Sequence, residues 1–286
     1  MVLIGESINI TSRKIGEAMR NRDKKPIQEL ALLQEERGAN MLDVNIGPAR
    51  KEGKELMSWV VEVIQEVSRL PLSLDTTNPE AMEGGLALCK ERPLINSASC
   101  QEERLSKMLP LASKYGCNII CLLLTDAGLP RDVDERVSLS LMITERANSL
   151  GIPNDRIFID PVMFTVTVDQ KQVVYFREFL EILPSLFDPP CKSTCGLSNV
   201  SQGIPSPELR SIMNQGAFCI SHQAGIYSAI VNVLDDDFME TVQGIKKEGS
   251  VDGYLSVASQ EKRTNLEKTI KVLKNESLYC HSWLEL

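Results

Sequence analysis

The sequence predicts an α/β protein folded as a single (β/α)8 TIM barrel. Short apolar runs rich in β-branched residues alternate with longer segments of helical periodicity, and eight such strand–helix units follow one another. The connections between them are short, which is typical of parallel strands joined by helices. A chain of 286 residues is also a natural length for one barrel of this kind.

The expected strands are the apolar runs that close on a polar residue or a turn. An open doubly wound sheet is the alternative arrangement, but the stretch GESIN after the first run contains neither a GxGxxG turn nor a phosphate-binding loop. The eight expected strands cover residues 3–5, 41–44, 72–74, 94–95, 119–124, 157–159, 192–195 and 226–231.

Helix-start signals separate these strands. A helix that begins near Asp23 and ends at Gly38 should present one apolar face that includes Leu33. We expect residues 1–286 to form one domain, in which 244–286 are a charged, helical extension of the barrel. The other expected helix starts are Asn78 with Pro79, a capping box of Ser99 and Glu102, Asp132 or Asp134, Pro207, and Asp235 to Asp237.

The composition excludes several classes of partner. A net charge of −8 and a pI near 5.1 argue against nucleic acid and anionic membranes. The first residues, MVLIGESINI, lack the pattern of a signal peptide, and no apolar run reaches the roughly 20 residues of a membrane helix, so a cytoplasmic protein is expected. Eight cysteines without a CxxC pair, and only two histidines, predict reduced thiols and no bound metal.

A set of carboxylates and carboxamides follows the expected strands. One aspartate in such a position is usually a helix cap, but a whole set without Lys, Arg or His points to a shared pocket at one mouth of the barrel. Carboxylates accept hydrogen bonds and carboxamides both donate and accept, which suits a neutral heterocycle such as a pterin better than a phosphate. A divalent cation is the competing ligand, disfavoured by the amides. The set is Glu6, Asn9, Asp43, Asn45, Asp75, Asn96, Asp160 and Asn199.

The stretch KSTCGLSNVSQ at 192–202 is the seventh member of this pattern. A short strand is expected to end at Cys195, after which Gly196 permits a turn that carries Ser198 and Asn199. Taken alone, these residues are typical of any loop. Among the other strand ends they predict one wall of the pocket.

Six motifs together resemble the pterin-binding methyltransferases that move a methyl group between tetrahydrofolate and a corrinoid protein. They are IGESIN at the start, LDVNIGPA at 42–49, LSLDTTNP at 72–79, LINSAS at 94–99, IDPV at 159–162 and GLSNVSQG at 196–203. The motifs span about the first 235 residues in order, and the last 50 or so match less clearly.

The resemblance implies a barrel of the pterin-binding type with defined residue roles. Asp75, Asn96 and Asp160 would hold the pterin edge, Asn199 would lie beside N5, and Gln202 near the folate or the incoming corrinoid. Asn199 and Asp160 are the expected catalytic residues. The expected folate-binding residues are Glu6, Asp43, Asn45, Asp75, Asn96, Asp160, Gly196, Ser198, Asn199 and Gln202.

The resemblance also implies substrates and partners. The methyl group would pass between N5 of tetrahydrofolate or 5-methyltetrahydrofolate and the cobalt of a corrinoid (cobalamin) carried on a separate, transiently docked protein. Direction stays open, because the same pocket could serve donation to Co(I) or acceptance from methyl-Co(III). A homodimer is implied as well.

Four other functions are weighed against this one. Dihydropteroate synthase would need basic residues for its pyrophosphate leaving group, and the strand-end motifs contain none. The stretch HQAG at 222–225 partly resembles the HxxG of cobalamin-binding domains, but Ile220 stands where an Asp is expected. A zinc-dependent methyltransferase would need a thiolate–histidine set that Cys280-His281 does not supply. A folate-binding protein without catalysis is the remaining alternative.

Overall fold

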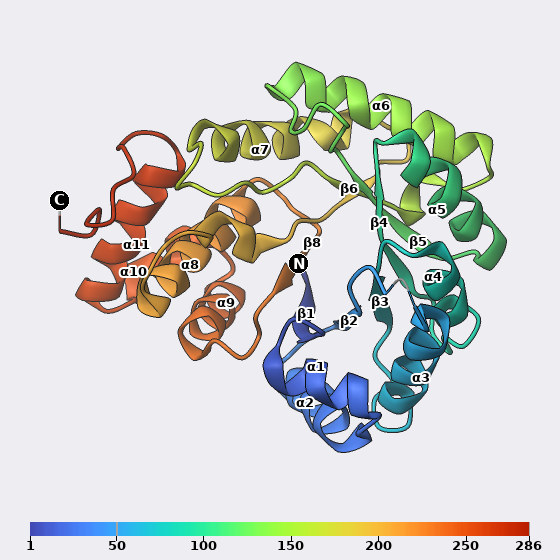
Figure 1. Cartoon of the computed structure of the whole chain (residues 1–286). Helices are drawn as coiled ribbons and strands as arrows, with labels where there is room; N and C mark the ends of the chain where they lie inside the picture. The colour runs from blue at the N-terminus through green and yellow to red at the C-terminus, as the bar shows by residue number, and fades with distance from the viewer. Residues whose placement is uncertain (50, 286) are drawn as a thin grey trace.

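The computed structural model describes residues 1–49 and 51–285, and in it eight parallel strands form a nearly closed barrel, as the sequence predicts (Figure 1). The strands pair in the order β7-β6-β5-β4-β3-β2-β1-β8. The last gap is bridged where the Ile230 amide donates to the Cys195 carbonyl at 2.8 Å. The strands are β1 (Val2–Asn9), β2 (Met41–Asn45), β3 (Leu72–Asp75), β4 (Leu94–Ser99), β5 (Asn118–Leu122), β6 (Ile157–Asp160), β7 (Lys192–Ser193) and β8 (Ser228–Val231).

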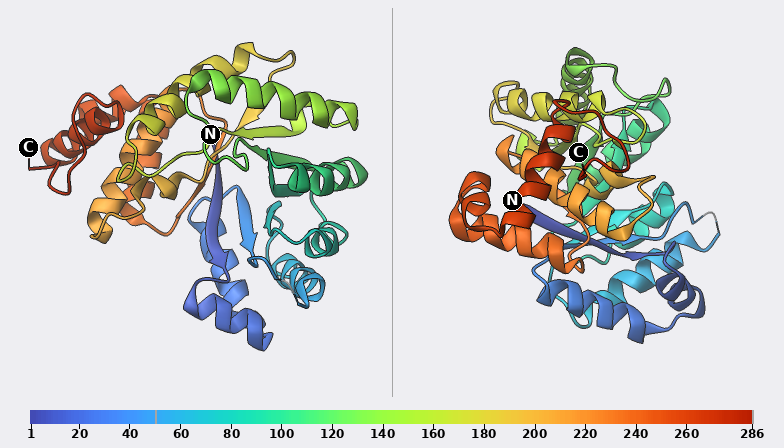
Figure 2. Two further views of the ribbon diagram at one scale, coloured as in Figure 1. Left: turned by 45° about the horizontal axis from the view of Figure 1, so that its top comes forward. Right: turned by 90° about the vertical axis from the view of Figure 1, so that its left-hand side faces the viewer.

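Helices surround the barrel on its outside (Figures 1 and 2). No helix within the described residues is long and apolar enough to cross a membrane. The α-helices are α1 (Arg13–Asn21), α2 (Lys24–Glu36), α3 (Gly53–Gln65), α4 (Pro79–Leu86), α5 (Glu102–Tyr115), α6 (Val133–Ser149), α7 (Lys171–Ile182), α8 (Pro207–Gln223), α9 (Asp236–Glu248), α10 (Val251–Val257) and α11 (Gln260–Leu273). Short 3-10 turns are η1 (Asn154–Arg156), η2 (Leu183–Ser185) and η3 (Leu197–Ser201).

The strand residues alternate between two separate apolar clusters. Because successive side chains of a strand point to opposite faces, every second residue faces the helices and the others face the barrel interior. The large cluster, which includes Leu3, Leu42 and Ile95, joins the strands to the helices. The small cluster fills the lower interior and is here called the barrel plug; it consists of Ile4, Met41, Leu94, Ile120 and Phe158.

The side chain of Lys192, packed over two aromatic rings, covers the lower end of the barrel plug. Lys192 at the start of β7 places its Nζ 5.1 Å from the ring centroid of Phe158 and 5.0 Å from that of Tyr227. These distances are within the range of a favourable cation–π contact. The interior above the plug is consequently reached from the carboxyl ends of the strands.

A bulge in β1 prepares the first site residue. The pairing of β1 with β2 shifts register between Gly5 and Ile8. The buried Gln34 of α2 accepts a hydrogen bond at 3.0 Å from the Ser7 amide through its Oε1 atom. A side chain at Gly5 would meet that same oxygen at 2.5 Å, so the close approach of α2 requires glycine there. The bulge lengthens β1 and directs Glu6 toward the mouth.

Some local expectations are confirmed and others are wrong. Asn78 caps α4, Asp132 caps α6 and Asp235 caps α9, as predicted. The expected capping box of Ser99 and Glu102 does not form, because α5 begins after Gln101 and the Ser99 hydroxyl donates to the Gln101 side chain at 2.8 Å. Leu33 is 39% exposed rather than buried, and α1 was not anticipated.

The helices after residue 244 pack on the barrel instead of extending into solvent. In both figures α10 and α11 lie outside α8 and α9. The indole of the buried Trp283 donates to the Thr269 hydroxyl at 3.0 Å, which fixes the last turn against α11. Gln170, which precedes α7, donates to the carbonyls of Val272 and Ser277 at 2.6 Å each, and so ties this region to the mouth side of the barrel.

The close contact of α8 with α11 gives a test of this packing. Gly216→Ala would place a Cβ 2.6 Å from Thr269 Cγ2 and 3.1 Å from Leu273 Cδ1. Thr269 is held by Trp283, so we expect a loss of about 1–3 kcal/mol in the free energy of unfolding measured in urea. The exposed Gln223→Ala on the same helix should change it by less than about 0.5 kcal/mol. Wild-type stability of the Gly216 variant would show that α11 does not pack as described.

Candidate active site

The polar residues that end β2, β3 and β4 lie side by side in the sheet. Asn45 is paired with Asp75, and Asp75 with Asn96. Residues at one level of neighbouring parallel strands point to the same face, so the three side chains form a row inside the barrel above the plug. The sequence expectation that these strand ends meet is therefore confirmed for this row. The peptide bond between Asn96 and Ser97 is cis.

Asp43 lies one inward position deeper than this row. Its Oδ1 atom accepts hydrogen bonds from the Ser73 hydroxyl at 2.6 Å and from Asn96 Nδ2 at 3.0 Å. The residue is 4% exposed. Burial raises the pKa of Asp43 to about 6, while the hydrogen bonds from Ser73 and Asn96 act in the opposite direction.

Asp75 shares its carboxylate with the neighbouring strand. Asn45 Nδ2 donates to Asp75 Oδ2, and Asn45 Oδ1 accepts from the Gly47 amide at 2.9 Å, which fixes the orientation of the amide. Burial and the nearby charge of Asp43 raise the pKa of Asp75 to about 7 against the lowering effects of Asn45 and Arg104. A carboxyl group with this pKa exchanges its proton near neutral pH.

Glu6 is joined to the seventh strand end. The Ser198 hydroxyl donates to Glu6 Oε2 at 3.0 Å, although the two residues are 192 positions apart in the sequence. Burial raises the pKa of Glu6 to about 7; the Ser198 hydrogen bond lowers it and the charge of Asp43 raises it. Glu6, Asp43 and Asp75 therefore form one electrostatically linked group.

Asp160 occupies a separate position at the end of β6. It is 7% exposed, and its Oδ1 atom accepts a hydrogen bond from the Val162 amide at 2.8 Å. Burial raises its pKa to about 7, opposed by the Val162 amide and by the charge of Arg136. Directly after β7, the Thr194 amide donates to the Ile159 carbonyl, while the buried Thr194 hydroxyl has no hydrogen-bond partner among the described residues. Such a group is a natural contact for a ligand.

The stretch after β7 forms a compact 3-10 turn, η3. A side chain on Gly196 would lie 2.9 Å from Asn199 Nδ2, so the missing side chain makes room for the Asn199 amide. Asn199 Oδ1 accepts from Gln202 Nε2 at 2.8 Å. The structure thus brings Gly196, Asn199 and Gln202 together, with Ser198 turned toward Glu6.

A cavity of about 490 Å³ opens beside this turn. It lies between the ends of β1 and β8, η3 and the first turns of α8, and of the carboxylates described above it borders Glu6. Its lining offers both acceptors and one cation. The lining residues are Glu6, Ser198, Ser201, Gln202, Gly203, Pro207, Arg210, Ser211, Asn214, Asn232 and Asp235.

One expected member of the set is used differently. Asn9 closes a local turn, because its Oδ1 atom accepts from the Thr11 amide at 2.9 Å and from the Thr11 hydroxyl at 2.7 Å. Ser73 was not anticipated, although the alternation in LSLD places it on the same face as Asp75. The strand-end pattern does not include Arg104 and Arg136, because these two arginines come from helices.

The site as a whole is rich in carboxyl groups whose pKa values are raised to about 6 or 7. Four carboxyl groups, supported by amides and hydroxyls, face one mouth of the barrel and suit a neutral ring whose edge donates several hydrogen bonds. Within the part of the chain that the structure describes, no group of three His, Cys, Asp or Glu side chains is arranged to hold a metal ion.

Comparisons with known proteins agree with this chemistry. The sequence pattern of the family described as "Pterin binding enzyme" matches residues 5–232. The chain is 29% identical to the methylcorrinoid:tetrahydrofolate methyltransferase of Eubacterium limosum, over 85% of this chain and 89% of the relative. It is 27% identical to the methionine synthase of Mycobacterium leprae over 81% of this chain, which spans 20% of that longer relative.

Solved structures with the same fold include dihydropteroate synthases. The enzyme of Xanthomonas albilineans with 4-aminobenzoic acid superposes with a TM-score of 0.65 at 22% identity, covering 88% of this chain and 92% of that one. The enzyme of Thermus thermophilus gives 0.64 at 21% identity, covering 86% and 93%. At this level of identity the likeness establishes the barrel fold alone.

The raised pKa values predict how stability depends on pH. The folded-state pKa of Asp160 is about 7 against an ordinary value of 3.8, so the folded chain binds more protons than the unfolded chain between about pH 4 and 7. Its contribution to stability is complete below pH 4 and is lost as the pH rises through 7. Asp160→Asn, which keeps an acceptor for Val162, should reduce the fall in unfolding free energy between pH 5 and 7.5 by on the order of 2 kcal/mol.

Urea unfolding at the two pH values measures this difference. The exposed Asp155→Asn is the matched control and should leave the fall unchanged. Equal falls for wild type and Asp160→Asn would contradict the described environment of Asp160.

Proposed function

The chain belongs to the family of pterin-binding enzymes, and from this premise we propose that it is a methyltransferase that moves a methyl group between N5 of tetrahydrofolate and a corrinoid carried on a separate protein. The similarity to the Eubacterium limosum methyltransferase, which covers most of both chains, supports this reaction. The name of that relative gives the methylcorrinoid as donor and tetrahydrofolate as acceptor, and we propose the same direction here.

The observation that carries the proposal is the linked set of acceptors at the mouth. A pterin presents an amino group and a ring N–H next to a carbonyl oxygen. We propose that Asp75 and Asp160 accept hydrogen bonds from the amino group and ring N–H of the pterin. We assign Asn96 to the part of the ring that both donates and accepts. Its Nδ2 donates to Asp43, and its oxygen serves as the acceptor for the ring. Ionised carboxylates make the stronger bonds to these donors.

Asn199 is assigned to the reacting nitrogen. If the methylcorrinoid is the donor, the Co–C bond breaks, the N5–C bond forms from the N5 lone pair, and the N5 proton must leave. In the opposite direction the N5–C bond breaks, the carbon bonds to Co(I), and N5 takes a proton. A carboxamide oxygen beside N5 stabilises the positive N5 of either transition state, and Asn199 Oδ1 has a second lone pair besides the one used by Gln202.

Proton transfer requires a group other than Asn199. A carboxamide does not act as an acid or a base near neutral pH, so the proton must pass through water or a carboxyl group. Asp160 is our candidate, because burial holds its pKa at about 7. The carboxyl group of Glu6 also has a pKa of about 7 and lies beside Ser198, and it is the alternative group for this proton transfer.

The corrinoid is assigned to a partner protein because the HQAG stretch, which partly resembles a cobalamin-binding motif, lies away from the carboxylates. His222 of the HQAG stretch lies in the last turn of α8 and lines a cavity of about 370 Å³ with Met1, Leu3 and Arg37. That cavity adjoins the start of β1, whereas the carboxylates stand at the carboxyl ends of the strands. We propose that the corrinoid protein docks transiently over the mouth.

Dihydropteroate synthase activity is the second candidate, favoured by the fold likeness alone. It would need cations for a pyrophosphate at the mouth. Arg104 is nearby, but its guanidinium already donates to the carbonyls of Thr77 at 2.6 Å and Ser97 at 2.7 Å, which leaves Arg210 as the single cation among the described residues that line the cavity beside η3. Incubation with 4-aminobenzoate and a dihydropterin pyrophosphate should therefore yield no condensation product.

We also propose a homodimer. Exposed apolar side chains on α6, Leu141 at 46% and Met142 at 38%, are suited to an interface on this side of the barrel. Analytical ultracentrifugation of the wild type and of a variant with Leu141→Glu measures the assembly directly.

The reaction itself is tested with free corrinoids. Methylcobalamin and tetrahydrofolate should give a cobalt absorbance change and 5-methyltetrahydrofolate when the chain is added, and 5-methyltetrahydrofolate with cob(I)alamin should run the reverse reaction. Asp155→Asn, an exposed position outside the site, should be as active as wild type. Folate binding without either reaction would leave a binding protein and reject the methyltransferase.

Asn199→Ala separates catalysis from binding. Loss of one preorganised polar group at the reacting atom should slow methyl transfer by roughly 10²–10³ while tetrahydrofolate affinity falls far less. The same substitution at Asn148, exposed at the opposite end of the barrel in α6, should change neither quantity. Equal losses of rate and affinity would make Asn199 a binding residue only.

A further inference from the structure

Arg136 of α6 is a fully buried cation whose hydrogen bonds all go to uncharged oxygens. Its side chain is 0% exposed. Nε donates to the Pro161 carbonyl at 3.0 Å, Nη1 to the Asp132 carbonyl at 3.1 Å and the Pro130 carbonyl at 3.4 Å, and Nη2 to Gln172 Oε1 at 2.7 Å. Burying a charge that makes no direct ion pair is destabilising, so stability alone does not account for an arginine here.

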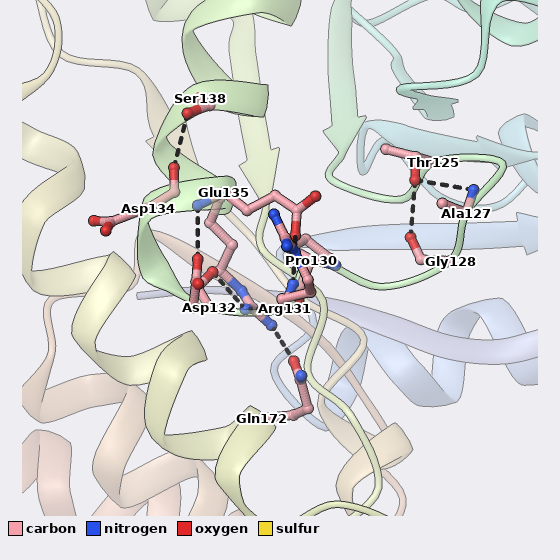
Figure 3. A network of polar contacts seen from close by, with 11 residues as sticks. Thr125, Ala127, Gly128, Pro130, Arg131, Asp132, Asp134, Glu135, Ser138 and Gln172 are labelled. Carbon is pink, nitrogen blue, oxygen red and sulfur yellow. Dashed lines mark hydrogen bonds and ion pairs between the residues drawn. The ribbon is translucent and has the colours of Figure 1, made fainter.

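The arginine joins three segments at the mouth of the barrel. Figure 3 shows Pro130 and Asp132 at the start of α6 facing Gln172 of α7. The Pro161 carbonyl, directly after β6, completes the set. Arg136 thereby holds the loop that follows β5, the loop that follows β6 and the first turn of α7 in one arrangement.

The loop after β6 needs such a restraint. Val162 has a φ of +66°, a left-handed conformation that is strained for a β-branched residue. Its amide donates to Asp160 Oδ1 at 2.8 Å. The direction of the Asp160 carboxylate is therefore coupled to a backbone conformation that persists only while its surroundings hold it. The neighbouring residue, Pro161, is held in place because its carbonyl accepts a hydrogen bond from Arg136 Nε.

We propose that Arg136 is a positioning residue, which fixes the strained loop 161–162 so that the Asp160 carboxylate faces the mouth, and whose charge favours the ionised form of that carboxylate. The part of this proposal that concerns pterin binding rests on the proposed function. The part that concerns the carboxylate itself does not.

The electrostatics around Asp160 agree with this role. The charge of Arg136 lowers the pKa of Asp160 against burial, and burial in turn lowers the pKa of Arg136 to about 10. Burial and, secondarily, the charge of Asp160 raise the pKa of the Cys195 thiol, which lies just after β7. The other groups that act on Arg136 are Asp132 and Glu135 on α6 and Tyr175 on α7.

Titration of Asp160 tests the proposal without any ligand. The signal of its carboxyl carbon is followed by NMR in protein labelled at aspartate and is assigned by its loss in Asp160→Asn. Arg136→Met, which keeps the length but removes charge and donors, should raise the midpoint by about one pH unit, a tenfold gain in proton affinity. Arg136→Lys, which keeps the charge, should raise it by less than half as much.

A matched control separates positioning from general loss of stability. Ile143→Ala creates a cavity at a buried position on the same helix and should lower the melting temperature while leaving the Asp160 midpoint in place. An unchanged midpoint in folded Arg136→Met would overturn the proposal. If that variant does not fold, Arg136→Lys carries the test, and wild-type values for both its midpoint and its tetrahydrofolate affinity would overturn it.

Binding of tetrahydrofolate at pH 7 supplies the second readout. We expect about tenfold weaker binding for Arg136→Met and about threefold for Arg136→Lys, with no change for Ile143→Ala. Wild-type protein that binds no tetrahydrofolate would reject the proposed function, whereas the titration of Asp160 would still decide the role of Arg136. Weakened binding with an unchanged midpoint would contradict the assigned electrostatic role.

Discussion

The desolvation of carboxyl groups inside a barrel is the constraint on which the rest of this site depends. An aspartate moved from water into a protein interior becomes costly when ionised, and each of the four carboxyl groups is accordingly given a donor. Ser198 serves Glu6, Ser73 and Asn96 serve Asp43, Asn45 serves Asp75, and the Val162 amide serves Asp160. The result is a pocket whose charge is adjustable near neutral pH.

The fold supplies these donors from elements that the chain order keeps apart. Neighbouring strands bring Asn45, Asp75 and Asn96 to one level, and closure of the barrel brings Ser198 to Glu6. Helices contribute from behind, through Gln34 at the bulge of β1 and Arg136 at the end of β6. The carboxyl groups are thus supported from strand and helix alike, which keeps a strongly polar interior compatible with a stable barrel.

The sequence predicted what depends on local pattern. Short apolar runs rich in β-branched residues and capping residues such as Asn78 located the strands and several helices, and the polar strand ends identified the acceptors that the structure brings together. What failed depends on tertiary contacts. The helix α1 is only nine residues long, and its apolar stripe consists of just Ile15, Ala18 and Met19. The Ser99 hydroxyl donates to Gln101 instead of capping a helix, and nothing in the periodicity of α6 distinguishes Arg136 from a surface residue.

The barrel plug also determines the route that protons take. Because Ile4, Leu94, Ile120 and their neighbours close the interior from below, the carboxyl groups exchange protons with bulk water only through the open end. Any macromolecule that covers that end would isolate them from solvent. The number of protons held by Glu6, Asp43, Asp75 and Asp160 would then be fixed when that macromolecule binds. The pH of the medium would affect the binding step and not the reaction inside the covered pocket.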